Sequence, residues 1–268
     1  MKPIVDYHNH TFLCGHAVGE PCGYVEQALK TGLKEIGFSD HAPLVCHDDP
    51  TITMSFDQLP RYHEMIEDVQ KDYKDKDIKI RLGIEADFVP GFEEKTKGIL
   101  DGYAYDYVIG SVHFIGDFAF DNPTQKERLK TNNINKVYLD YHKLLRQSAE
   151  SGLFDIMAHV DLVKKFGDRP TEDLSDDVKA TAAVFKKTGV VIEINSSGLR
   201  KPVQEIYPSL SSLKIYCEAG VPITFGSDSH IPIEVGSGFE QAFELACQAG
   251  YSEYVLFEKR QISEKVKL

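Results

Sequence analysis

Three histidines near the amino terminus could together bind a metal ion. They stand in the segment IVDYHNHTFLCGH, where His8 and His10 follow a short apolar run and His16 comes six residues later. Residues two apart in a strand point to the same face, so His8 and His10 can reach one ion. Cys14 lies between them and His16, and its thiolate would be a soft ligand. This segment alone is compatible with a metal site, with core histidines, or with a shared redox and metal patch.

Seven of the ten histidines stand at or just beyond the end of a predicted strand. They are His8, His10, His16, His41, His113, His159 and His230. Two carboxylates share that position, Glu85 in GIEAD and Asp228 in FGSDSH. Imidazole and carboxylate ligands together suit zinc, iron and manganese. Because one ion needs three or four ligands, these nine side chains predict two or three ions with at least one bridging carboxylate.

The remaining histidines have simpler interpretations. His63 and His142 fall inside predicted helices, and His47 lies in the polar loop CHDDP. We expect structural or surface roles for these three. Any single strand-end histidine could also be a hydrogen-bonded core residue, but seven in that position indicate a common site, because active sites of parallel-strand barrels lie at the carboxyl ends of the strands.

Short apolar runs rich in Ile, Val, Phe and Tyr predict the strands that position this site. The seven runs span 4–8, 35–40, 78–86, 105–113, 154–160, 190–195 and 222–228. Apolar residues at three- and four-residue spacing predict helices between them. These helices span 24–32, 55–76, 135–152, 175–189 and 236–250. Ser55 is a possible N-cap of the second one. The alternation implies a parallel α/β sheet with right-handed crossovers, which we expect to form one barrel domain over residues 1–268.

The composition is that of an ordinary globular protein with an acidic surface. The formal net charge is −12, which argues against nucleic acid or an anionic membrane as the main partner. No apolar stretch is long enough to span a bilayer, and no CxxC occurs among the five cysteines. No GxGxxG follows the first strand, and no phosphate-binding P-loop motif occurs. We therefore expect a cytoplasmic protein that acts on a small molecule; the sequence does not fix its oligomeric state.

Six ordered motifs over residues 6–230 make the chain resemble the polymerase and histidinol phosphatase (PHP) superfamily. They are DYHNHT, FSDHAP, GIEAD, GSVHF, MAHVD and FGSDSH. The resemblance implies a distorted seven-stranded β/α barrel with a cluster of three divalent ions, which could be zinc, manganese or iron. It assigns one ion to His8, His10, Glu85 and Asp228, a second to Glu85, His113 and His159, and a third to His16, His41 and His230.

Two longer segments, YDYVIGSVHFI and NSSGLRKPVQEIYPS, are similar to the histidinol-phosphate phosphatases of histidine biosynthesis. This resemblance implies hydrolysis of L-histidinol phosphate to L-histidinol and phosphate. Bound metal lowers the pKa of water from 15.7 to about 7, so a hydroxide bridging two ions could attack phosphorus in line. Consistently, the chain has no GxSxG motif for a serine nucleophile.

Other functions stay open for such a barrel. A nuclease or nucleotide phosphoesterase could use the same metal site, although the acidic charge disfavours long nucleic acids. A metal-storage or regulatory protein would have a closed site, whereas catalytic sites keep an open position. Metal-dependent amidohydrolases also begin with HxH after their first strand, but many carry a strand-end lysine that the fourth strand of this chain lacks.

Basic and polar residues after the strands are candidates for substrate contacts and catalysis. Arg200 and Lys201 follow the sixth strand and could bind the phosphate, Arg200 with two parallel hydrogen bonds. Asp161 follows the fifth strand and could bind an amine or protonate the leaving alkoxide. Asn195 ends the sixth strand and is a further candidate for substrate binding.

Aromatic residues and two further carboxylates complete the predicted site. Phe118, with Phe114 and Phe120, follows the fourth strand and could form a pocket for an imidazole ring. Asp6 and Asp40 could hold metal-binding imidazoles by hydrogen bonds. Loop packing and strand-end hydrogen bonding explain these five residues about as well.

Overall fold

Seven parallel strands form the centre of the computed structural model, which describes residues 3–47 and 49–268. The strands are β1 Val5–Asp6, β2 Glu35–Phe38, β3 Lys79–Asp87, β4 Tyr107–Ser111, β7 Ile156–Met157, β8 Val191–Asn195 and β9 Ile223–Gly226. Their order in the sheet follows their order in the chain, and each neighbouring pair is parallel. All seven predicted strands are confirmed, although most are shorter than predicted.

Backbone hydrogen bonds between the first and last strands bend this sheet into a nearly closed barrel. Tyr7 N–H donates to Phe225 O over 3.1 Å, and Ser229 N–H donates to His8 O over 3.1 Å. His10 N–H also donates to Ser229 O, over 2.9 Å. The predicted distorted seven-stranded barrel is therefore confirmed, and its closure brings the HxH and SDSH motifs together.

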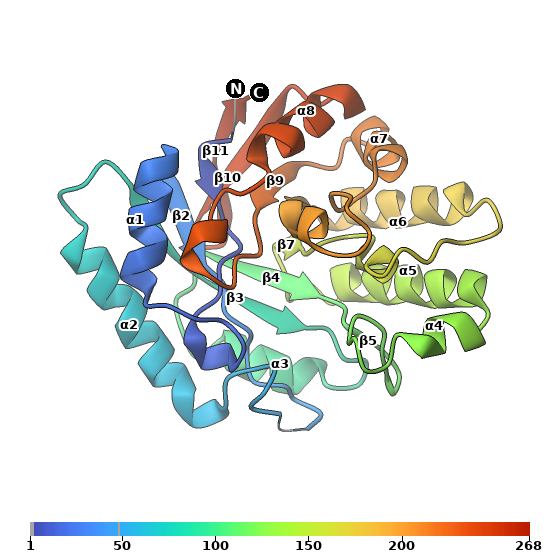
Figure 1. The fold of residues 1–268 in the computed structure, drawn as a ribbon, viewed down its shortest axis with the longest axis horizontal. Coiled ribbons are helices and arrows are strands. Elements are labelled where there is room, and N and C mark those ends of the chain that lie inside the picture. The colour runs from blue at the N-terminus through green and yellow to red at the C-terminus, as the bar shows by residue number, and fades with distance from the viewer. Residues whose placement is uncertain (1–2, 48) are drawn as a thin grey trace.

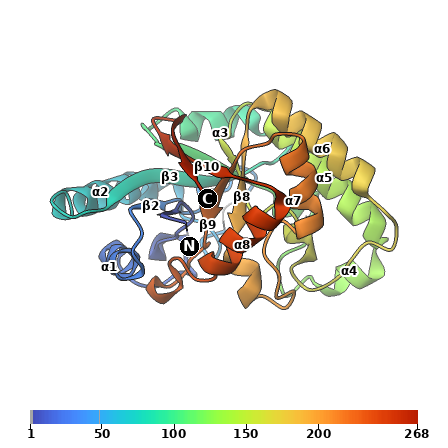
Figure 2. The ribbon, with the colours of Figure 1, turned by 90° about the horizontal axis from the view of Figure 1, so that it is seen from above.

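Helices surround the barrel on its outer side. They are α1 Pro21–Thr31, α2 Leu59–Asp72, α3 Glu93–Leu100, α4 Glu127–Thr131, α5 Ile134–Glu150, α6 Ser175–Thr188, α7 Leu210–Glu218 and α8 Phe239–Ala249. Figure 1 shows α1 and α2 on one side of the sheet and α4 to α8 on the other, and Figure 2 shows the same division from above. No helix in the described part of the chain is long and apolar enough to cross a membrane.

Local sequence signals explain where several of these helices begin. Gln58 Oε1 accepts a hydrogen bond from Ser55 N–H over 2.9 Å, and these residues lead through a short 3₁₀ turn into α2. The Asn133 side chain accepts from Lys136 N–H and caps α5. α5 then buries residues at three- and four-residue spacing, among them Tyr138, Tyr141 and Leu145, against the barrel.

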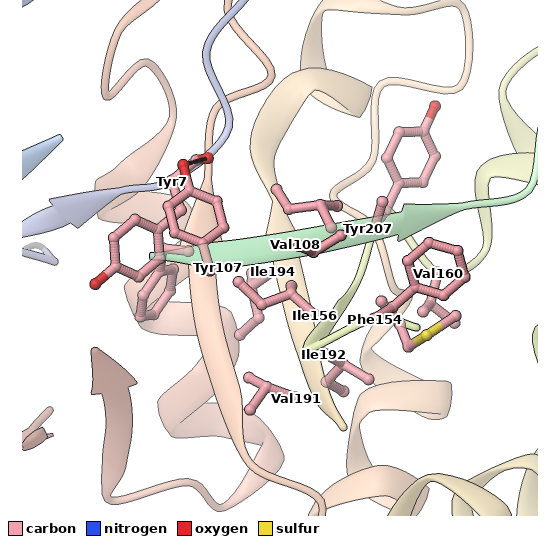
Figure 3. Packing of buried hydrophobic residues seen from close by; sticks show 14 of the residues in the cluster. Tyr7, Tyr107, Val108, Phe154, Ile156, Val160, Val191, Ile192, Ile194 and Tyr207 are labelled. Atoms are coloured by element: carbon pink, nitrogen blue, oxygen red, sulfur yellow. Dashed lines mark hydrogen bonds between the residues drawn. The ribbon is translucent and has the colours of Figure 1, made fainter. Parts of the chain in front are cut away.

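Buried tyrosine, phenylalanine and aliphatic side chains of the strands belong to one continuous hydrophobic core (Figure 3). Tyr107 is buried, and its hydroxyl donates to Tyr7 O over 2.6 Å. A Cβ atom at Gly37 or Gly83 would lie only 2.1 or 2.3 Å from the Tyr107 side chain, so both strands need glycine beside this ring. The tyrosine thereby links β1 to β4 below the carboxyl-terminal ends of the strands.

Two hairpins were not predicted from the sequence. β5 Phe114–Ile115 and β6 Phe118–Ala119 form one after β4. β10 Glu253–Glu258 and β11 Gln261–Lys267 form the other, whose Arg260 side chain pairs with Asp155 just before β7. The second hairpin therefore covers the amino-terminal end of the barrel and leaves the carboxyl-terminal end open.

Candidate metal centre

The nine predicted metal ligands converge at the carboxyl-terminal end of the barrel. A cavity of about 300 Å³ opens there and is lined by seven of them. Those seven are His16, His41, Glu85, His113, His159, Asp228 and His230. The other two, His8 and His10, lie fully buried beneath them. Closure of the barrel explains this convergence, because side chains at successive strand ends point to one centre.

The first group contains His8, His10, Glu85 and Asp228. His8 Nε2 lies 3.1 Å from Glu85 Oε2 and 4.0 Å from Asp228 Oδ1. His10 Nε2 lies 3.7 and 3.2 Å from the same two oxygen atoms. Ligand atoms about 2.0–2.2 Å from a zinc ion lie roughly 3–4 Å apart, so these four atoms have the spacing of one coordination sphere.

Two further groups adjoin the first one. Glu85 Oε1 lies 3.1 Å from His159 Nε2 and 4.0 Å from His113 Nε2. His16, His41 and His230 have ligand atoms that all lie within 4.8 Å of one another. Because Glu85 presents its two oxygens to different groups, it has the placement of a bridging ligand.

Unsatisfied buried atoms indicate that a cation fits this centre. His10 is fully buried, and neither of its ring nitrogens makes a well-formed hydrogen bond among the described residues, although oxygen atoms of Asp228 and Asp40 lie 3.2 and 3.5 Å away. Buried polar atoms are otherwise almost always satisfied. Two residues of the centre also have left-handed backbone conformations, His159 with φ 26° and Asp228 with φ 53°. Such strain in non-glycine residues concentrates at functional sites.

The ionisation of the carboxylates favours cation binding. Burial alone would raise the pKa of Glu85, but His41 and His8, with a hydrogen bond from His159, hold it well below its ordinary value. Burial likewise opposes ionisation of Asp228, and the imidazoles around it lower its pKa well below the ordinary value. Both side chains are therefore carboxylates at neutral pH and can serve as anionic ligands.

Two imidazoles of the outer group, His16 and His230, are neutral at neutral pH. Burial and the neighbouring His41 and His10 lower the pKa of His16 to about 4. Burial and the neighbouring His10 also lower the pKa of His230. Neutral imidazoles keep a free lone pair, which a metal ion requires. Cys14 lies near His10 and His230, but burial raises the pKa of its thiol, so these harder ligands remain preferred.

Carboxylates behind the imidazoles fix the orientation of their rings. Asp87 Oδ1 lies 2.8 Å from His113 Nδ1, and Asp40 Oδ1 lies 3.5 Å from His10 Nδ1. Asp40 was predicted to hold an imidazole by a hydrogen bond, and it faces His10 Nδ1 without a well-formed one, whereas Asp87 was not predicted. Asp6 instead accepts hydrogen bonds from Ser227 and from backbone N–H groups, and its carboxylate contacts no imidazole ring among the described residues. Asp6 therefore supports the closure of the barrel.

The two predicted phosphate-binding residues have different surroundings. Lys201 lines the metal cavity, and Lys165, which was not predicted, lines it from the opposite loop. Arg200 does not line it. Its Nη2 donates to Ser227 O over 2.7 Å and to Asp228 O over 3.2 Å. The structure thus places Arg200 behind the Asp228 ligand and Lys201 in front of it.

Asp161 and Asn195 also point away from the cavity lining. Asp161 has φ 80°, which turns its carboxylate toward Ser209 N–H at 2.9 Å and toward Lys164 Nζ at 3.9 Å. Burial opposes ionisation of Asp161, but Lys164 lowers its pKa, and an ionised carboxylate cannot donate a proton to an alkoxide. The Asn195 side chain accepts from Ser197 N–H and belongs to the local turn. This geometry does not favour the substrate roles predicted for either residue.

Phe118 and Phe114, both predicted for an aromatic pocket, lie in different surroundings. Phe118 is buried, packs against Phe120, and has the Arg128 guanidinium over its ring. Phe114 instead lines a second cavity of about 330 Å³ that shares His16, His41 and His113 with the metal cavity. The β5–β6 hairpin pairs Phe114 with Ala119 and Ile115 with Phe118, so Phe114 faces this cavity and Phe118 faces the opposite side.

The other histidines behave largely as predicted. His63 is bound between Leu59 O and Tyr105 Oη at 2.6 and 2.9 Å. His142 is buried beside Thr181. His47 is exposed, and it lines the second cavity next to Phe114.

Replacing Arg200 with Ala is expected to lower metal affinity by roughly tenfold, because the backbone of Asp228 loses two hydrogen bonds. Metal content after dialysis and the KM for a phosphate ester would be measured together, with Lys201→Ala as the matched control. Lys201→Ala should raise KM at full metal content. If Arg200→Ala instead raises KM at full metal content, the Arg200 guanidinium of the wild-type protein binds phosphate, as the sequence alone predicts.

The sequence pattern of the PHP domain matches residues 6–197, which is more than half of the chain. The barrel, the HxH motif at its first strand and the nine converging ligands agree with this match. The chain belongs to the PHP domain family.

Within that family, the chain is similar to histidinol-phosphatases. A probable histidinol-phosphatase from Deinococcus radiodurans is 41% identical over 264 residues, which are 98% of this chain and 99% of that protein. The histidinol-phosphatase of Bacillus subtilis is 31% identical and is matched over 89% of this chain and 98% of its own. The crystal structure of histidinol phosphate phosphatase from Lactococcus lactis, complexed with zinc, L-histidinol and phosphate, has a TM-score of 0.80 at 25% identity and covers 97% of this chain and 98% of that chain.

Proposed function

We propose that this chain is a histidinol-phosphatase, a metal-dependent phosphomonoesterase that hydrolyses L-histidinol phosphate to L-histidinol and phosphate. The similarity to a probable histidinol-phosphatase across almost the full length of both chains supports this substrate. The observation that carries the chemistry is the placement of Glu85 between two groups of imidazoles in one cavity.

Three divalent ions fit the three groups of ligands described above. Zinc is the ion named in the complex of the Lactococcus lactis relative, and manganese and iron suit the same imidazole and carboxylate ligands. When bound, such ions neutralise phosphoryl oxygens and lower the pKa of a water molecule held between them. The side chains of this chain then have the tasks of binding the ester and keeping it in line.

Lys201 and Lys165 are the side chains that bind the phosphoryl group in this proposal. Both line the metal cavity, and Lys165 Nζ is held 3.0 Å from Asp121 Oδ2. An ammonium group is a compact charge that can contact a phosphate oxygen without two-point geometry. Two lysines that approach the cavity from different loops would orient the ester between them.

The second cavity would accommodate the alcohol part of the substrate. Phe114 and His47 give it flat rings, and Asp49 and Asp121 give it carboxylates. Burial opposes ionisation of Asp121, but Lys165 and His113 lower its pKa, so it carries a negative charge. An imidazole ring and an ammonium group are the complementary partners for such a lining.

A cytoplasmic location is part of the same proposal. All five cysteines are free thiols, and Cys22, Cys46 and Cys247 are exposed. Exposed thiols remain reduced in the cytosol, whereas oxidising compartments favour disulfides.

The test is phosphate release by the metal-loaded enzyme from three esters. We expect L-histidinol phosphate to be hydrolysed at least about a hundredfold more efficiently, in kcat/KM, than adenosine monophosphate or an aryl phosphate. The second cavity should bind the cationic alcohol and contribute roughly 3 kcal/mol to the transition state, which corresponds to that ratio. Equal efficiency on the three esters would contradict the proposed substrate while leaving a phosphatase.

A further inference from the structure

Glu193 is a buried carboxylate in the middle of β8 that lies behind the metal ligands. Its side chain is about 1% exposed. Oε1 lies 2.7 Å from His8 Nδ1. Oε2 accepts a hydrogen bond from His159 N–H over 2.8 Å and another from the Asn195 amide over 2.9 Å. Glu193 is not one of the nine candidate ligands. It contacts two of them, His8 and His159, on the side away from the other ligand atoms.

The contact with His8 decides which ring nitrogen is available to a metal ion. A carboxylate accepts a hydrogen bond, so Glu193 holds a proton on Nδ1 of His8, and Nε2 is the nitrogen that gives up its proton when a metal ion binds. The lone pair is then on Nε2, which faces Glu85 Oε2 at 3.1 Å. Glu193 therefore fixes both the tautomer and the ring orientation of His8.

The contact with His159 acts through the backbone instead. His159 has φ 26°, a conformation that non-glycine residues rarely adopt. The hydrogen bond from its N–H to Glu193 holds the residue in this conformation, in which its Nε2 lies 3.1 Å from Glu85 Oε1. One carboxylate thus supports a ligand from each of the two groups that share Glu85.

Space for this arrangement is kept by a glycine on the neighbouring strand. A Cβ atom at Gly226 would lie 1.8 Å from Glu193 Oε1 and 2.7 Å from His8 Cβ. No side chain at this position could coexist with the contact between Glu193 and His8. Strand β8 therefore supplies the Glu193 carboxylate, and β9 leaves the space that its contact with His8 requires.

We propose that Glu193 is a positioning residue that couples the two metal sites sharing Glu85, so that their two ions are bound and released as a pair. Loss of the Glu193 contacts misplaces His8 in one group and His159 in the other at the same time. The third group, His16, His41 and His230, has no contact with Glu193 in the described structure, and it adjoins the pair only through His41 Nδ1, which lies 3.0 Å from Glu85 Oε2. Loss of the Glu193 contacts should therefore leave the third ion in place. This inference rests on the proposal that all three groups hold ions.

The test compares Glu193→Gln with Asp87→Asn as matched carboxylate-to-amide changes. Asp87 supports a single ligand, His113, through a contact of 2.8 Å. The amide introduced by Glu193→Gln cannot accept from both His8 and His159, since one of its two terminal atoms is a donor. Glu193→Gln should therefore lose two ions together at about 10–100-fold lower chelator concentration than wild type, whereas Asp87→Asn should lose one.

Metal content per chain and the visible absorption of the cobalt-loaded protein would be followed across the chelator titration. If Glu193→Gln keeps its ions as tightly as wild type, or loses a single one first, the coupling is overturned although the metal centre stands. If the Glu193→Gln variant fails to fold, a chelator titration of the wild-type protein still tests the coupling. Release of the three ions in three separate steps would overturn it. Fewer than two ions in fully loaded wild type would overturn both the coupling and the proposed metal centre.

Discussion

Replacing Glu85 with Gln is expected to remove two ions from the centre and to lower kcat/KM by at least about a thousandfold. Glu85 is buried and lies 3.0–3.1 Å from nitrogen atoms of His8, His41 and His159. The amide is nearly the same size, so packing is preserved. However, the substitution removes the negative charge of residue 85. It also directs an NH₂ donor toward imidazole nitrogens, whose lone pairs must stay free to bind a metal ion.

Metal content by mass spectrometry and phosphate release from histidinol phosphate would check this expectation. Glu64→Gln, on the exposed face of α2, makes the same chemical change away from the site and should leave both quantities unchanged. Full metal content in Glu85→Gln with activity within tenfold of wild type would show that Glu85 is not a bridging ligand.

The barrel and the convergence of the nine candidate ligands are predictable because one rule produces both. Buried parallel strands are apolar runs, and the polar residue that ends each run must lie at the carboxyl end of the barrel. His159 and Asp228 were predicted as candidate ligands in this way although their strands are short, since the prediction requires only the position where each strand ends. The β10–β11 hairpin was missed because β11, from Gln261 to Lys267, is mostly exposed and polar and has no apolar run.

The direction of a side chain beyond a strand end could not be predicted. Asp161 and Arg200 have suitable chemistry and lie close to the site in sequence, but the positive φ of Asp161 turns its carboxylate toward Ser209. In the same way, a 3₁₀ turn buries Lys164 and presents the adjacent Lys165 to the cavity. Such backbone turns depend on contacts with distant loops, which the local pattern does not contain.

Glu193 did have a signal in the sequence. It interrupts the apolar run VVIEIN, which forms a strand buried along its whole length. A charged residue in such a strand requires a buried partner, because an isolated buried charge is very costly. A carboxylate inside a predicted strand therefore predicts a buried partner, which is His8 for Glu193 and Arg81 for Glu35.

Removal of the metal ions should abolish activity and also destabilise the fold. Without cations, the carboxylates of the buried Glu85 and the half-buried Asp228 depend on imidazoles alone for charge compensation, and both ring nitrogens of His10 lack a well-formed hydrogen bond. An ion present at about 100 times its Kd adds about 2.7 kcal/mol to the free energy of unfolding. For a chain of 268 residues, each kcal/mol corresponds to roughly 2–4 °C in Tm.

Three ions would therefore raise the Tm by at least about 10 °C over the chelated protein, and re-addition of zinc or manganese should restore both stability and phosphate release. Differential scanning calorimetry on loaded, chelated and reloaded protein measures the first effect, and metal analysis counts the ions. The steps need not be equal, because the third group is more exposed than the pair that shares Glu85. A Tm that chelation leaves unchanged, or full activity with a single bound ion, would contradict a centre of three ions.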